Sequence, residues 1–125
     1  MKWRSLLMLL CGCGSGAVTQ NTFGDEPLQS LTTSSGLEVK LWTNPQPPTR
    51  GQLAVKFDFV GHHADDITAE VTPWMPAMGH GTASVSTDDA LVAEGLSLYM
   101  PGTWELRTQL SGAVSDAFVV ELSIP

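Results

Sequence analysis

Gln52-Leu53-Ala54-Val55-Lys56-Phe57-Asp58-Phe59 is the stretch that decides the fold class of this 125-residue chain. Every second residue from Leu53 to Phe59 is apolar, and the residues between them are polar or small. Because successive side chains of a strand point to opposite faces, this period of two predicts a strand with one buried face. The same alternation recurs at residues 37–42, 67–72, 82–87, 96–100, 104–110 and 118–122.

Turn signals separate these segments. They are a proline-rich stretch at residues 45–48 and the pairs Asp88-Asp89, Pro101-Gly102 and Ser111-Gly112. The segments between them carry no convincing helical pattern, and the length of the chain allows a single domain. About seven short strands with regular turns predict an all-β, antiparallel β-sandwich. A small antiparallel barrel is the alternative.

The amino-terminal residues combine positive charge with a short apolar run. The basic residues Lys2 and Arg4 precede the apolar run Leu6–Leu10. This run is too short to span a bilayer, because a spanning helix needs about 20 apolar residues. Leu10-Cys11-Gly12-Cys13 resembles the lipobox of bacterial lipoproteins. We therefore expect residues 1–12 to be a lipoprotein signal peptide and Cys13 to be lipidated. Cys11 is the weaker candidate because bulky Leu10 precedes it, and a redox or metal-binding cysteine pair is the alternative.

This signal predicts that the protein is lipid-anchored in the cell envelope and faces the periplasm or the exterior. If the source is Gram-negative, the anchor is expected in the outer membrane. Residues 13–36 are rich in Ser, Thr, Gly, Gln and Asn, which predicts a flexible tether, with residues 28–33 as a candidate edge strand. The folded domain is then expected at residues 37–125. The formal net charge of −7 makes nucleic acid an improbable partner and restricts membrane contact to the anchor.

Soft metal donors are concentrated in Trp74-Met75-Pro76-Ala77-Met78-Gly79-His80-Gly81. Thioether sulfur suits Cu(I), and imidazole suits copper or zinc. Pro76 and the two glycines shape the segment as a loop and disfavour a helix. These residues predict a surface copper site of Met75, Met78 and His80, completed by Met100 at the end of a later strand, with Cu(I) as the metal.

Each candidate ligand also has an ordinary structural interpretation. Met75 and Met78 fill irregular apolar space equally well, His80 could bond a backbone carbonyl, and Met100 could face inward with Leu96 and Leu98. A second group of donors lies in the polar segment His62-His63-Ala64-Asp65-Asp66, where a solvated loop is the alternative to a Cu(II) or zinc site. The tryptophans Trp42, Trp74 and Trp104 are expected in the core or at its rim.

Three blocks of the chain carry a family resemblance. Met75–Gly81, then Met100–Leu106, then Asp116–Val120 resemble in sequence and order the YtkA-like domain, over residues 37 to 123. The resemblance implies an immunoglobulin-like sandwich related to CopC-like copper-binding proteins, which are often exported or lipid-anchored. It also implies a connection to copper.

No catalytic motif is recognisable, since the chain lacks a Gly-x-Ser-x-Gly elbow, a His-Glu-x-x-His pair, a P-loop and a dinucleotide fingerprint. We therefore expect no enzyme activity. The leading expectation is a lipid-anchored, extracytoplasmic copper-binding or copper-handling protein, a carrier or a sequestering module, with a copper-transfer or envelope protein as its partner. The alternative is a metal-free β-sandwich that serves as an accessory or protein-interaction module in an envelope complex.

Overall fold

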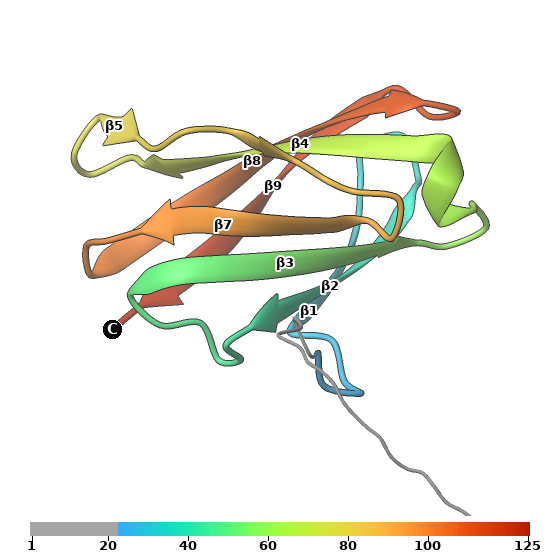
Figure 1. The fold of residues 1–125 in the computed structure, drawn as a ribbon. Coiled ribbons are helices and arrows are strands. Elements are labelled where there is room, and N and C mark those ends of the chain that lie inside the picture. The colour runs from blue at the N-terminus through green and yellow to red at the C-terminus, as the bar shows by residue number, and fades with distance from the viewer. Residues whose placement is uncertain (1–22) are drawn as a thin grey trace, which may run out of the picture.

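The computed structural model describes residues 23–125, and the expected signal peptide, Cys13 and the first part of the tether lie outside these residues. Within the described part, the chain is built of strands and one 3-10 turn, η2 (Ala64–Asp66). The strands form two antiparallel sheets that pack face to face (Figure 1). The predicted all-β sandwich is confirmed.

The first sheet has the strand order β1-β2-β3-β7, and the second has the order β5-β4-β8-β9, with β6 also paired to β4. The bounds of the strands are β1 (Gln29–Thr32), β2 (Glu38–Asn44), β3 (Gly51–Phe59), β4 (Ile67–Met75), β5 (His80–Gly81), β6 (Val85–Ser86), β7 (Val92–Leu98), β8 (Gly102–Gly112) and β9 (Asp116–Ile124).

Alternation along the strands builds the core between the two sheets. On β3, Leu53, Val55, Phe57 and Phe59 are all buried, as the period of two predicts. A register shift opposite Leu53 and Val55 puts one extra residue into β7, so the alternation breaks there and Glu94 and Gly95 are both exposed. Ala54, on the other face of β3, is also buried. Residues from both sheets complete the core: Val39, Leu41, Ile67, Ala69, Val71, Met75, Ala93, Leu96, Leu98, Trp104, Leu106, Leu110, Phe118, Val120, Leu122 and Ile124.

The number and extent of the strands need correction. Residues 23–125 hold nine strands rather than about seven, because the edge segment forms β1 and the two-residue strand β5 is added. The strand expected over residues 82–87 shrinks to Val85–Ser86, which pairs with Glu70 and Val71 of β4. A short segment rich in Ser and Thr buries too little apolar surface to extend further.

The tether expected over residues 13–36 is too long. Its last part forms β1, which pairs with β2 from Gln29↔Leu41 to Thr32↔Glu38, so the edge strand expected around residues 28–33 is confirmed. Thr33 is buried, and its hydroxyl donates to Asp116 Oδ2 of β9 at 2.7 Å. Pairing and burial therefore hold this polar segment in the domain despite its composition.

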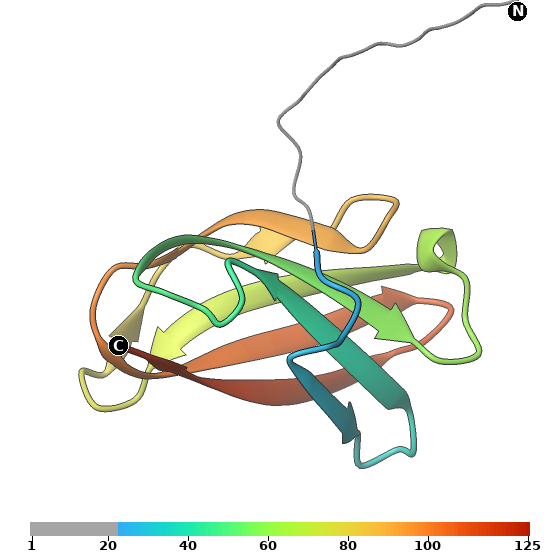
Figure 2. The ribbon, with the colours of Figure 1, turned by 90° about the horizontal axis from the view of Figure 1, so that it is seen from below.

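The connections gather at the two ends of the sandwich. The β4–β5 hairpin and the β7–β8 connection lie at one end, and η2 and the β8–β9 turn lie at the other, as both ribbon views show (Figure 1, Figure 2). We call the first the hairpin end. None of the helices in residues 23–125 is long and apolar enough to cross a membrane.

Candidate functional site

The segment expected to bind metal forms a tight hairpin at the hairpin end. Met75 is the last residue of β4, residues 76–79 form the turn, and His80 begins β5. The register pairs Met75 with His80 and Trp74 with Gly81. Gly79 has a φ of +68°, a left-handed conformation that glycine adopts without strain. The expected absence of a helix is confirmed, and the loop is shorter than expected because both of its ends are paired as strand.

The two methionines of the hairpin lie in different environments. Met75 is only 4% exposed, and its Cε lies 2.7 Å from the point where a Cβ on residue 102 would stand. A side chain at position 102 would make the flexible end of Met75 shift, and the φ of +132° there also favours glycine. Met78, by contrast, is 51% exposed in the turn. Met75 therefore fills core space beside Gly102, while the thioether of Met78 is open to solvent.

Met100 lies in the connection after β7 rather than on the strand itself. β7 ends at Leu98, so the expected inward face of Leu96 and Leu98 does not extend to Met100. Met100 is half-buried against the core, and its carbonyl accepts a hydrogen bond of 2.8 Å from Nε1 of the buried Trp104. Since the connection leads directly into Gly102, Met100 is at the same end of the sandwich as Met75.

His80 faces a residue that the sequence did not single out. Its imidazole stacks on the ring of Tyr99, with ring centroids 6.3 Å apart and an interplanar angle of 5°. The Tyr99 hydroxyl and His80 Nδ1 are 3.4 Å apart, within hydrogen-bonding reach. The rings of Tyr99 and Trp104 in turn pack edge to face, with their centroids 5.9 Å apart. The hairpin of one sheet is thus joined to the end of the other sheet through aromatic rings.

The structure therefore brings Met75, His80 and Met100 to one end and leaves Met78 on the exposed turn. Because directly paired residues of antiparallel strands point to the same face, Met75 and His80 project from the same side of the hairpin. Two thioethers and one imidazole form a soft donor set that fits Cu(I). Nothing in the sequence marked Tyr99 as part of this site, since the alternation around it predicts only that its side chain faces outward.

The second group of donors lies at the opposite end. His62 and His63 are exposed in the β3–β4 connection, and Asp65 and Asp66 are exposed in η2. Over residues 23–125, no group of three or more His, Cys, Asp or Glu side chains is arranged to hold a metal ion. His62 and His63 therefore do not join the hairpin residues.

The tryptophans divide between the core and its rim. Trp104 is fully buried, whereas Trp42 and Trp74 are half-buried on outward faces of the sheets. Trp74 lies under the Arg107 guanidinium, with 4.7 Å from Cζ to the ring centroid, and Arg107 Nη2 also pairs with Glu105 at 3.0 Å. Both alternatives expected for the tryptophans occur in this molecule.

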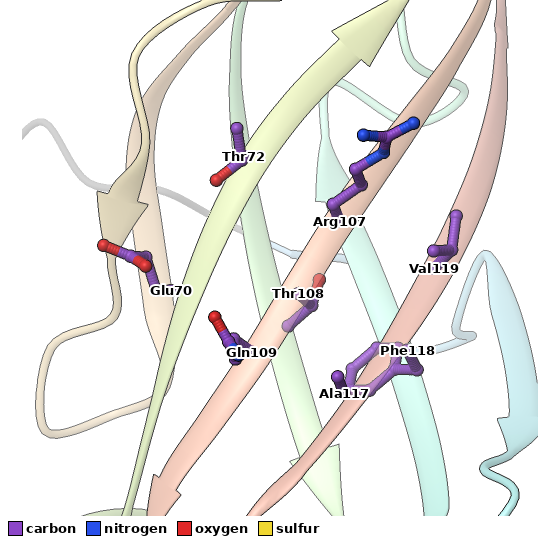
Figure 3. Close-up of a pocket in the computed structure, with 8 residues that line it drawn as sticks. All are labelled: Glu70, Thr72, Arg107, Thr108, Gln109, Ala117, Phe118 and Val119. Carbon is purple, nitrogen blue, oxygen red and sulfur yellow. The ribbon is translucent and has the colours of Figure 1, made fainter. Parts of the chain in front are cut away.

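A shallow groove of about 400 Å³ lies on the outer face of β4, β8 and β9 (Figure 3). Its apolar residues lie on β9, where Val119 is 52% exposed (Figure 3). The lining residues are Glu70, Thr72, Arg107, Thr108, Gln109, Ala117, Phe118 and Val119. The sequence did not predict this groove, because alternation identifies outward positions without showing which of them gather on neighbouring strands.

The fold and the hairpin end define an all-β sandwich with a soft-donor cluster at one end. No protein-family model matches the chain, and neither curated proteins nor solved structures gave a match.

Proposed function

We propose that this chain is a lipid-anchored, extracytoplasmic copper-binding or copper-handling protein, a carrier or a sequestering module. It binds Cu(I) through Met75, His80 and Met100 at the hairpin end. The observation that carries the proposal is the cross-strand pair of Met75 and His80, which puts a thioether and an imidazole on the same face. Met78 is 51% exposed on the same hairpin, so of the thioethers of Met75, Met78 and Met100 it is the most accessible to incoming copper.

The ligand set suits transfer better than permanent storage. Three ligands leave a position at which the donor of a partner can attack before the existing bonds break, unlike a closed four-ligand structural site. Thioethers bind Cu(I) without releasing a proton, so the metal can be handed over with little change in protonation. The lipobox-like sequence ending at Cys13 and the resemblance to the YtkA-like domain support the same function.

The deciding measurement is competition for Cu(I) against a chromophoric chelator under reducing conditions. Cys11 and Cys13 are replaced by Ser in every variant, because thiolates also bind Cu(I). The variant carrying Met75→Leu, His80→Ala and Met100→Leu should bind Cu(I) more than about 100-fold more weakly, beyond the 10–100-fold typical of losing an outer-shell partner. Met-to-Leu changes nearly conserve volume and should cost less than about 1.5 kcal/mol each, so the fold should survive.

The matched control is His62→Ala, which removes an exposed imidazole at the other end of the sandwich. It should leave the affinity for Cu(I) unchanged. If the triple variant holds Cu(I) as tightly as its parent, the site is not at the hairpin end and the copper proposal fails.

A metal-free interaction module is the second candidate, and the groove of Figure 3 favours it. A photo-crosslinking residue in place of Val119 should then capture a discrete envelope protein in intact cells. The control position is Asp58, which is exposed on the outer face of the other sheet. Equal labelling from both positions would count against the groove as an interface.

A further inference from the structure

Tyr99 is an exposed residue whose ring nevertheless makes two specific aromatic contacts. It is 47% exposed, yet its ring stacks on that of His80 and packs edge to face with that of Trp104. Trp104 is itself fully buried and is held through its Nε1 hydrogen bond to the Met100 carbonyl. A core residue therefore braces Tyr99, and Tyr99 braces the imidazole.

The contact with His80 is directed at one ring nitrogen. The Tyr99 hydroxyl lies 3.4 Å from Nδ1. A neutral imidazole carries one N–H, and the hydrogen bond made by one nitrogen determines which nitrogen remains free to bind a metal. If Nδ1–H donates to the phenol oxygen, Nε2 keeps its lone pair and is the metal-binding atom.

We propose that Tyr99 is a positioning residue that holds His80 as the Nδ1–H tautomer and in a fixed ring plane, so that Nε2 is presented to Cu(I). This inference rests on the proposed copper function. The stack fixes the ring plane, and the hydroxyl selects the tautomer. The two contributions are separable because phenylalanine retains the ring and lacks the hydroxyl.

The first test needs no metal. Nitrogen-15 NMR of the histidine rings in the full chain, recorded well above the ordinary pKa of about 6.5 of imidazole, reports which nitrogen carries the proton. His80 should be mainly the Nδ1–H tautomer in the parent and should shift towards Nε2–H in Tyr99→Phe. His62, at the opposite end, is the internal reference and should not change. A parent His80 that is mainly Nε2–H, or a tautomer that Tyr99→Phe leaves unchanged, would overturn the inference.

The second test measures affinity for Cu(I) in the same chelator competition. Tyr99→Phe should weaken binding by about 10–100-fold, the usual effect of losing an outer-shell partner, and should have no effect when His80→Ala is already present. If His80→Ala loses Cu(I) while Tyr99→Phe binds as the parent does, the role of Tyr99 is refuted and the copper site stands. If the parent itself does not bind Cu(I), the proposed function and the metal part of this inference fail together, and the tautomer measurement alone decides the contact.

Discussion

At the residue scale, one carboxylate joins the two sheets away from the hairpin end. Asp116 begins β9 and accepts hydrogen bonds from the hydroxyls of Ser35 at 2.6 Å and Thr33 at 2.7 Å, both in the connection after β1. It also accepts a bond of 2.8 Å from its neighbour's backbone N–H, that of Ala117. These bonds, with that from Ser35 the largest contributor, lower the pKa of Asp116 below its ordinary value of 3.8.

The Asp116→Asn variant should have a lower free energy of unfolding than the parent, and the size of this difference should depend on pH. Because the folded pKa is depressed, the charged form stabilises the fold fully above pH 3.8, and this contribution is lost as the pH falls through the folded value. Urea unfolding from pH 7 to pH 2 should therefore show a deficit for the variant that is constant at neutral pH and shrinks below pH 3.8. A deficit of the same size across the whole range would contradict the assignment. Asp58→Asn, on the outer face of β3, is the control.

At the element scale, the β4–β5 hairpin depends on a close approach of two backbones. A Cβ on residue 81 would collide with the carbonyl oxygen of Pro73, so Gly81 has no room for a side chain. The same carbonyl accepts a hydrogen bond of 3.1 Å from the Thr82 N–H, which closes the hairpin. The Thr82 hydroxyl then donates to the Ser97 carbonyl at 2.8 Å, at the end of β7. Backbone packing directly after His80 thus helps to set its position.

Gly81→Ala should force β5 away from β4. We expect a loss of about 1–3 kcal/mol in the free energy of unfolding, as for other insertions into close-packed sites, and faster hydrogen exchange at the Thr82 amide. Gly24→Ala is the matched control, since a Cβ there meets no atom within 4 Å. An unchanged Thr82 amide in Gly81→Ala would show that the hairpin has room to absorb a side chain.

At the scale of the whole molecule, the amino-terminal part of the described chain closes the sandwich. The Gln29 side chain of β1 donates to the Glu121 carbonyl of β9 at 2.8 Å, bridging the edges of the two sheets. Further back, the Gln46 side chain donates to the Glu26 carbonyl at 2.9 Å, and Lys56 Nζ lies over the rings of Phe23 and Trp42, at 5.4 Å and 4.5 Å from their centroids. The folded unit therefore includes residues well before position 37.

Two shortened chains test this boundary. A chain of residues 23–125 should unfold at the same urea concentration as the full chain, whereas residues 37–125 should be less stable by roughly 2–5 kcal/mol. The shorter chain loses β1, and each lost hydrogen bond costs about 0.5–1.5 kcal/mol. It also leaves β2 as an unpaired edge, which favours aggregation. Equal stability of the two chains would restore the boundary predicted at residue 37.

The sequence by itself determined where most strands lie and which of their residues face the core. The alternation from Leu53 to Phe59 is a local property, because side-chain direction along a strand follows from backbone geometry alone. The loop after Met75 was equally local, since Pro76 and Gly79 mark a turn, whereas the strand pairing of Met75 with His80 was not predicted. By contrast, the edge strand β1 had only a faint pattern, because its stability comes from pairing with β2 and not from its own composition.

Only the tertiary structure decided which of these residues meet. It buried Met75 beside Gly102, left Met78 in solvent, and put Tyr99 against His80, although 19 positions separate the last two in the chain. Alternation gives a residue its face, but its neighbours across the fold depend on strand register, on the lengths of the turns and on how the two sheets pack. The donor types and their grouping at one end of the sandwich were therefore predicted from the sequence, while the burial of Met75 and the contact between Tyr99 and His80 were not.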